Sequence, residues 1–380
     1  MNPERVCELF MRTSGGKDIA VIEGAMGLYD GGMNSTAEIA KLIHAPVIAV
    51  LNVKSIGETA ASIALGLREY DREVNLAGVI LNHAGSDSHI RIISDELNRI
   101  GIKVFGALRR NEALMIPERH LGLLPFTENT NYDFDSVRAI IEECVDVDEM
   151  IHISDDVREC ICESSRPSVN HKVRVAIARD EAFTFYYPES IDTLRELGAE
   201  ITYFSPIHDD KLPKADGYIF GGGFPEIFAR ELEANESMRE SVRQSANSGA
   251  PMLAECGGFM YLCDSMTDIH GNKFSMAGVI HYDSFMTDRP VIGYIEAESL
   301  SDNIMCSEGD VIRGHEFHYS RVNQEDEFAF MMTRRRTGEA YTGGYTHGNI
   351  LASYLHVNFF GNSELAERFL SRIDINRTLR

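Results

Sequence analysis

A cysteine between a short apolar run and two glycines is the residue of this sequence best suited to covalent chemistry. Cys256 follows the apolar run 251–255 and precedes Gly257 and Gly258, after which an apolar helical pattern begins. We expect a strand, a sharp turn and a helix, which would present the Cys256 sulfur at the carboxyl end of the strand. The amino end of a helix lowers the pKa of a nearby thiol, and a thiolate attacks carbonyl carbons readily.

Two further segments supply what such a nucleophile requires. The pattern at 348–356 predicts a strand that ends in His356, a candidate base for Cys256. The strand-like run 215–220 leads into the glycine-rich segment 221–226, whose free N–H groups suit a developing oxyanion. The predicted oxyanion hole consists of the backbone N–H groups of Gly222, Gly223 and Gly257. On local sequence alone, an inert packing cysteine remains the alternative.

These three segments also carry a family resemblance. Gly-Gly-Gly-Phe-Pro-Glu at 221–226, Ala-Glu-Cys-Gly-Gly-Phe-Met-Tyr-Leu at 254–262 and Ala-Ser-Tyr-Leu-His at 352–356 occur in this order. They resemble the class I glutamine amidotransferase domain of the cobyrinic acid a,c-diamide synthase family, which includes the Ni-sirohydrochlorin a,c-diamide synthases. The resemblance implies that glutamine is hydrolysed at the cysteine and that an ATP-dependent synthetase domain, N-terminal to it, uses the ammonia.

The catalytic triad of this class is incomplete here. Many class I amidotransferases place a glutamate two residues after the histidine, but this sequence has Asn358 at that position. We therefore predict a Cys256–His356 dyad and assign no third catalytic residue.

Carboxylates near the N-terminus indicate a nucleotide site. Residues 18–22 read as a buried strand that ends in the glycine-rich loop 23–32, and acids at a strand exit suit Mg²⁺ and a nucleotide. The segment Glu-Gly-Ala-Met-Gly-Leu-Tyr-Asp-Gly resembles the synthetase motif of the family. The resemblance implies that Glu23 is a Mg²⁺ ligand and that Asp30 lies near the tetrapyrrole carboxylates. A turn with two solvated acids is the alternative.

Three more residues of this half are candidate ligands for nucleotide or substrate. Asn82, at a predicted strand exit, resembles a family asparagine that could read the nucleotide base, although a turn-forming asparagine fits as well. Arg119 and His120 lie in Ile-Pro-Glu-Arg-His-Leu-Gly-Leu, a close family match. With Arg109 and Arg110, they form a cationic group that suits phosphates or tetrapyrrole carboxylates, or else an ordinary solvated face.

Alternating patterns predict an α/β protein with two domains. In the first half, strands are expected at 46–51, 76–81 and 103–108, and helices at 2–13, 56–67, 88–100 and 137–144, with a capping box at 35–38. In the second half, strands are expected at 173–178, 200–204 and 217–220, and helices at 190–197 and 237–248. The predicted organisation is a truncated P-loop-type parallel-sheet synthetase domain at 1–163, a linker at 164–172 and a flavodoxin-like class I amidotransferase domain at 173–380.

The phosphate loop of the family is missing from the sequence. A complete member would carry Gly-x-x-x-x-Gly-Lys-Thr between a strand and a helix, whereas here Gly16 and Lys17 are followed by Asp18. We expect that the loop comes from a separate chain or from self-association, that the sequence is a piece of a longer protein, or that the synthetase half has decayed. The sheet edge left by a lost first strand would favour pairing with another chain.

Composition limits the environment and the partners. The net charge of −23 argues against sequence-independent binding of nucleic acid and against binding to anionic membranes. No apolar stretch has the length of a membrane span, and the N-terminus is charged where a signal peptide would be apolar. Seven cysteines without regular spacing predict no disulfide framework. We expect a cytoplasmic protein.

The combined prediction is a ligase. The resemblance implies glutamine- and ATP-dependent, Mg²⁺-requiring amidation of the a and c acetate groups of cobyrinic acid, a step of cobalamin biosynthesis. The first alternative is the same reaction on Ni-sirohydrochlorin, in coenzyme F430 biosynthesis. The second is a glutaminase or partner subunit without synthetase activity of its own. A partitioning-type ATPase would explain only the N-terminal half. The strand-like segment containing His315 and His318 has no predicted role.

Overall fold

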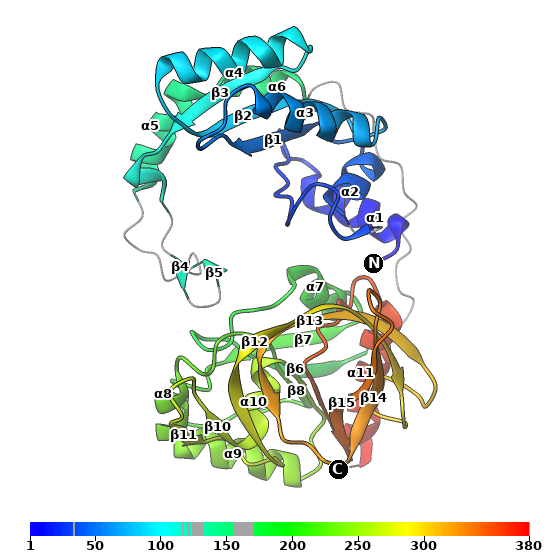
Figure 1. The fold of residues 1–380 in the computed structure, drawn as a ribbon. Coiled ribbons are helices and arrows are strands. Elements are labelled where there is room, and N and C mark those ends of the chain that lie inside the picture. Colours follow the sequence, from blue (N-terminus) through cyan, green and yellow to red (C-terminus); the bar gives the residue numbers. More distant parts are fainter. Residues whose placement is uncertain (33–34, 116–117, 120–121, 124–132, 155–170, 380) are drawn as a thin grey trace. The chain divides into compact units, whose positions relative to one another are not determined.

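The computed structural model describes residues 1–380 except 33–34, 116–117, 120–121, 124–132, 155–170 and 380; for 118–119, 122–123 and 379 it describes the backbone only. The chain divides into a unit of Asn2–Ser164 and a unit of Ser165–Arg380, with which Met1 is grouped. Figure 1 shows that each unit builds its own sheet. Within the described ranges, no helix is both long enough and apolar enough to cross a membrane.

The N-terminal unit is built on a parallel sheet of three strands in the order β1-β2-β3. The predicted strands and helices of this half are confirmed, apart from one segment, and the capping box holds because the Ser35 hydroxyl accepts from the N–H of Glu38. The elements are α1 (Pro3–Ser14), α2 (Thr36–Leu42), β1 (Val47–Asn52), α3 (Thr59–Tyr70), β2 (Leu76–Ala84), α4 (Asp87–Arg99), β3 (Val104–Arg109), the 3-10 helix η2 (Glu112–Leu114), β4 (Glu118–Arg119), β5 (Gly122–Leu123), α5 (Phe134–Cys144) and α6 (Val147–His152).

Helices cover both faces of this sheet. The larger core packs α3 and α4 against one face and includes Leu81, Ile93 and Leu97. A smaller cluster around Phe105 packs α5 and α6 against the other face, as Figure 1 shows. A parallel sheet covered on both faces is the arrangement predicted from the alternation of strands and helices.

The strand predicted at 18–22 is wrong. These residues have no strand or helix structure, and Val21 is 90% exposed. An apolar run forms a strand when a neighbouring strand takes up its backbone hydrogen bonds, and no described strand pairs with this one. The alternation of apolar residues was therefore not sufficient to place the segment in the sheet.

The C-terminal unit is organised around one mixed sheet of eleven strands. Five neighbouring strands, in the order β16-β9-β8-β6-β7, run parallel to one another. The elements are β6 (Val173–Ala178), α7 (Pro188–Glu196), β7 (Ala199–Phe204), β8 (Gly217–Phe220), α8 (Ala229–Ala234), α9 (Glu236–Asn247), β9 (Met252–Glu255), α10 (Gly257–Leu262), β10 (Cys263–Thr267), β11 (Lys273–Ser275), β12 (Ile280–Ser299), β13 (Val311–Val322), β14 (Phe328–Arg334), β15 (Ala340–His347), β16 (Ile350–Ser353) and α11 (Ser363–Leu379).

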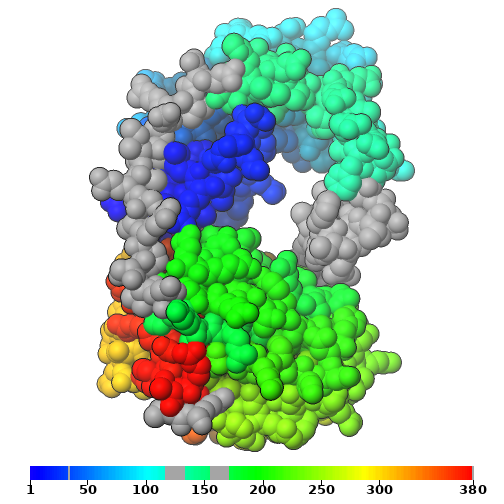
Figure 2. Space-filling view, turned by 180° about the vertical axis from the view of Figure 1, so that it is seen from behind, coloured from blue at the N-terminus to red at the C-terminus, as the bar shows by residue number. Residues whose placement is uncertain are grey.

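Alternate residues of these parallel strands enter two separate hydrophobic cores. Val175 and Ile177 of β6 join the core that contains α7 and α11. Ala176 and Ala178 join the core that contains α8, α9 and α10. Figure 2 shows α11, in red, at the surface beside the green first part of this unit. These parallel strands are thus covered on both faces, which leaves their ends as the place where their side chains meet solvent.

Candidate active site

Three neighbouring strands bring the predicted glutaminase residues to one edge of the sheet. Phe220 of β8 pairs with Ala254 of β9, which in turn pairs with Ala352 of β16. Because all three strands are parallel, their carboxyl ends lie together. The glycine loop, Cys256 and His356 follow these ends.

Cys256 occupies a strained turn between β9 and α10. Its φ of 49° and ψ of −101° place a residue with a side chain in a region that usually favours glycine. The turn is held by a hydrogen bond from its N–H to the carbonyl of Ser353 (2.8 Å) and by one from Gly258 to Gly221 (2.9 Å). The Cys256 residue is 8% exposed. The strand, sharp turn and helix predicted from sequence are therefore present.

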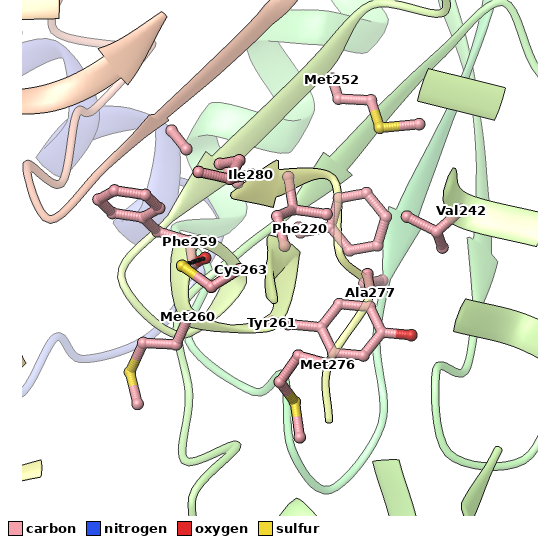
Figure 3. Close-up of a cluster of buried hydrophobic side chains, with 14 of the residues drawn as sticks. Phe220, Val242, Met252, Phe259, Met260, Tyr261, Cys263, Met276, Ala277 and Ile280 are labelled. Atoms are coloured by element: carbon pink, nitrogen blue, oxygen red, sulfur yellow. Dashed lines mark hydrogen bonds between the residues drawn. The ribbon is translucent and has the colours of Figure 1, made fainter. Parts of the chain in front are cut away.

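The helix that follows the cysteine is anchored in the apolar core. Phe259, Met260 and Tyr261 of α10 belong to the buried core, and Figure 3 shows Tyr261 beside Phe220 of β8. The thiol of Cys263 donates to the carbonyl of Phe259 (3.3 Å). A buried side chain that fills its site holds the local backbone in one position, so this packing stabilises the strained turn at Cys256.

The glycine loop approaches the turn so closely that side chains would not fit. A Cβ atom built on Gly257 would lie 2.9 Å from Cδ of Pro225 and 3.3 Å from the nitrogen of Gly223. A Cβ atom on Gly222 would lie 3.0 Å from Cε1 of His356. The N–H groups of Gly223 and Gly257 donate to no residue within the described part of the chain. Two unpaired N–H groups beside the nucleophile are what an oxyanion hole requires.

The imidazole of His356 is buried and packed on two sides. His356 is 4% exposed. Its ring stacks on the ring of His315 (centroids 5.1 Å apart, 23° between planes), and the ring of Phe185 meets it edge-on (5.1 Å). Backbone hydrogen bonds between His315 and His356 run in both directions, at 2.8 and 3.2 Å. The β13 segment left without a role by sequence therefore supports the histidine.

Two charged neighbours control the proton affinity of His356. Burial lowers the pKa of this imidazole, but the close polar groups of Cys256 and Glu255 and the attraction of their negative charges outweigh burial and raise the pKa to about 10. At neutral pH the imidazole is therefore protonated beside the sulfur. A protonated histidine of this kind favours the thiolate form of its partner.

Glu255 is the residue of this site that the sequence reasoning missed. Its Oε2 lies 3.6 Å from Nδ1 of His356, and its Oε1 accepts from the N–H of Val357 at 3.4 Å. Asn358, where many relatives in the class carry the acid, instead donates to Glu189 (2.8 Å) and accepts from Gly361. The sequence did contain a signal for this role, namely an acidic residue at the end of an otherwise apolar, buried strand. Such an acid indicates a nearby partner, because buried carboxylates are rare without one.

Two further ionisable side chains lie close to this site. Burial raises the pKa of Glu226, in the glycine loop, to about 7, and this acid is only partly exposed. Burial and the charge of His356 lower the pKa of His315 to about 4, so His315 is neutral at neutral pH. His318 points to the other side of β13, where its ring stacks on Tyr354 (3.9 Å).

The predicted nucleotide and substrate residues of the N-terminal unit are not gathered in the same way. Glu23 and Asp30 are exposed, and Oδ2 of Asp30 accepts from the N–H of Gly27 (3.0 Å) within a tight turn. Asn82 lies within β2, not at its exit, and its Oδ1 accepts from the N–H of the next residue, His83 (2.9 Å). No hydrogen bond or ion pair joins Glu23, Asp30 and Asn82 to one another.

The predicted cationic residues are described only in part. Arg119 lies in the short strand β4, for which the backbone alone is described, and His120 lies outside the described residues. Arg109 forms an ion pair with Asp87. Across the described ranges, no group of three or more His, Cys, Asp or Glu side chains could hold a metal ion.

Comparison with known proteins gives this arrangement a context. Residues 174–364 match the family of CobB/CobQ-like glutamine amidotransferase domains. This class is what the nucleophile turn, the glycine loop and the histidine define in the C-terminal unit.

Similarity to named proteins extends over nearly the whole chain. Two similar proteins are named cobyrinate a,c-diamide synthase. The one from Caldanaerobacter subterraneus subsp. tengcongensis is 40% identical over 98% of this chain and 84% of that protein. The one from Picrophilus torridus is 42% identical over 97% of this chain and 83% of that protein. A third, from Listeria innocua, is 40% identical over 94% and 82%. This chain belongs to the cobyrinate a,c-diamide synthase family.

Proposed function

We propose that this protein is a ligase that uses glutamine to amidate the a and c carboxylates of cobyrinate. The observation that carries the proposal is the assembly of Cys256, His356 and the glycine loop at three adjacent strand ends, in a chain that is similar along nearly its full length to cobyrinate a,c-diamide synthases. Glutamine is the amide donor, and ATP activates the acceptor carboxylate as an acyl phosphate.

The C-terminal unit performs the hydrolysis of glutamine. The Cys256 thiolate attacks the side-chain amide carbon, and the N–H groups of Gly223 and Gly257, with Gly222 beside them, stabilise the oxyanion. His356 donates its proton to the nitrogen as the C–N bond breaks, and ammonia leaves. The neutral imidazole then takes a proton from water, which attacks the thioester. Glutamate is released and the thiolate is restored.

The N-terminal unit is the proposed synthetase domain, in the roles that the family resemblance implies. Glu23 is the proposed Mg²⁺ ligand and Asp30 a substrate contact, with Asn82, Arg119 and His120 available to nucleotide or tetrapyrrole. The described residues alone do not fit a complete Mg²⁺ site, because Glu23 is exposed and belongs to no group of three or more His, Cys, Asp or Glu side chains of the described part that could hold a metal ion.

A further strand is a proposed partner of this unit. Among the described strands, β1 pairs only with β2, and Val50 of β1 is 61% exposed. The unpaired apolar segment at 18–22 is a second feature that a strand from another chain, or from a second copy, would cover. A separate chain in this position would also supply the phosphate loop, which a second copy lacks.

The direct test of this proposal supplies glutamine, Mg²⁺ and ATP to the purified chain with either cobyrinate or Ni-sirohydrochlorin. We expect a doubly amidated cobyrinate, detected by mass spectrometry. Product from Ni-sirohydrochlorin alone would overturn the choice of substrate. Glutamine hydrolysis without amidation of either acid would favour the second candidate, a glutaminase subunit, which the better assembled C-terminal site supports.

A further inference from the structure

Glu255 is charged, largely enclosed and placed against the catalytic histidine. Its side chain is 17% exposed, and it lines a pocket whose other walls are mainly apolar, including Ile177, Phe185 and Phe359. Low-polarity surroundings strengthen the attraction between opposite charges and penalise a carboxylate that has no partner. The one basic side chain that an ion pair gives Glu255, within the described part of the chain, is His356.

The ring nitrogen of His356 that faces Glu255 lacks a hydrogen-bond partner among the described residues. Nδ1 of His356 is buried and has no hydrogen bond within the described residues, and Oε2 of Glu255 is 3.6 Å away. That separation is longer than a hydrogen bond and short enough for an ion pair. Contacts between catalytic groups are often long without substrate and shorten during turnover.

The backbone fixes both members of this pair. Glu255 pairs with Ser353 in the register of β9 and β16, and its Oε1 accepts from Val357, directly after the histidine. The His356 ring is held between His315 and Phe185. One carboxylate therefore bridges the backbone and the ring of the same segment, which leaves Nε2 of the imidazole for Cys256.

We propose that Glu255 is the positioning acid of the glutaminase site: it orients His356 through Nδ1 and stabilises the imidazolium, in place of the acid that many class I amidotransferases carry two residues after the histidine. The inference rests on the proposed hydrolysis of glutamine at Cys256. In this chain the acid stands on the residue before the nucleophile, which brings the same three functional groups together.

The test is the pH dependence of Cys256 alkylation by iodoacetamide, with C256A as the background. The groups that face His356 are Cys256, Glu255 and the neutral His315, and Tyr187 contacts His315 from the other side. In the unsubstituted chain, the imidazolium beside Cys256 should favour alkylation at neutral pH. In E255Q, alkylation at neutral pH should fall, by about tenfold for each unit by which the pKa of His356 comes to lie below the pH of the assay. The rise in rate should move to higher pH.

A matched control separates this effect from a general loss of charge. Glu189 lies on α7 and accepts from Asn358, and it has no hydrogen bond or ion pair to His356. E189Q should therefore keep the alkylation profile of the unsubstituted chain. An E255Q profile that superimposes on that of the unsubstituted chain would overturn the proposal, even if glutamine hydrolysis were slower.

Two further measurements guard against misfolding of E255Q. In the unsubstituted chain, ¹⁵N NMR of His356, assigned by its loss in H356Q, should give a titration midpoint well above the ordinary value of a histidine. A midpoint near the ordinary value would contradict the proposal. In an H356Q background, E255Q should have no further effect on glutamine hydrolysis, because its action passes through the histidine. None of the alkylation or NMR measurements needs ATP or a tetrapyrrole, so failure of the proposed amidation would leave their outcome unaffected.

Discussion

The two units of this chain differ in how they hold the residues of their predicted chemistry. In the C-terminal unit, Cys256 and His356 are buried, the glycine loop is buried or partly buried, and all three are joined through three paired strands. In the N-terminal unit, Glu23 and Asp30 are exposed on a segment that belongs to no strand. A hydrolytic site needs few groups fixed by one sheet edge, whereas a site for nucleotide, metal and a large acid needs surfaces from several segments.

The largest expected effect separates the two activities. C256A should lower glutamine hydrolysis by at least about 10⁴-fold, because loss of a nucleophile removes the covalent route. Amidation supplied with free ammonia should continue. A coupled assay with glutamine or ammonium chloride measures both. C306A is the matched control, because Cys306 is buried in the other core of the same unit with its pKa raised by burial, and that variant should keep its glutaminase activity. Retained hydrolysis in C256A would refute the assigned nucleophile.

The converse substitution tests the other unit. E23Q should lose most of the amidation activity, with either nitrogen source, while its rate of glutamine hydrolysis stays within the error of the assay. The reason is that Glu23 is the proposed Mg²⁺ ligand and lies outside the glutaminase unit. E4Q, which changes an exposed acid near the start of α1, should leave both rates unchanged. Equal amidation by E23Q and the unsubstituted chain would remove Glu23 from the proposed site.

A smaller effect is expected from crowding the oxyanion hole. In G257A, the new Cβ would lie 2.9 Å from Pro225 and 3.3 Å from the nitrogen of Gly223, so the loop must shift. Loss of one oxyanion donor typically lowers kcat by about 10²- to 10³-fold. The kcat of glutamine hydrolysis in G257A should decrease by a factor within that range or somewhat smaller. The rate of Cys256 alkylation should stay unchanged. An unchanged kcat would argue that Gly257 does not contribute to the oxyanion hole.

Because His315 is partly buried in its neutral form, we expect the stability of the C-terminal unit to depend on pH. The pKa of His315 is about 4 in the folded chain and near 6.5 when unfolded, so between these values the unfolded state binds the extra proton. Stability should fall as pH decreases through this window. Urea midpoints measured from pH 7 to pH 4 should show a shallower fall in H315Q, while H270Q, which changes an exposed histidine, should follow the unsubstituted chain. Parallel curves for H315Q would exclude this contribution.

The smallest effect concerns the stability of the N-terminal unit. Gly66 lies within α3 with open space around a built Cβ, so G66A should stabilise the folded unit by about 0.5–1 kcal/mol through helix propensity. G78A is the opposite case, because its Cβ would lie 2.5 Å from the carbonyl of Lys103. Thermal unfolding of both variants measures the difference. A destabilising G66A would show that this helix is restrained by something other than its own propensity.

Much of the fold was accessible from sequence because strand and helix periods are local. The strands at 173–178 and 217–220 have the predicted bounds, and the turn at Cys256 was expected from its glycines. The segment at 18–22 failed because a strand also needs a neighbour, which no local pattern reports. A sequence pattern can thus describe a segment correctly as apolar and still misplace it.

The glutaminase site, like the fold, was predictable from the sequence in part. Motifs located Cys256, His356 and the glycines, since each follows a readable strand. The role of Glu255 depends on the parallel register of β9 and β16, which brings together residues about one hundred positions apart in the chain. Such a contact leaves no trace in the spacing around either residue, and the search for an acid two positions after His356 pointed to Asn358 instead.

The most direct test of the glutaminase assignment is covalent labelling with a diazoketone analogue of glutamine, followed by peptide mass spectrometry. The thiolate displaces N₂ from such an analogue and forms a stable thioether. We predict one adduct per chain, on the peptide that contains Cys256, and protection by excess glutamine. Labelling at another residue, or no labelling of a folded chain, would contradict the assignment of Cys256 as the nucleophile of a glutaminase site.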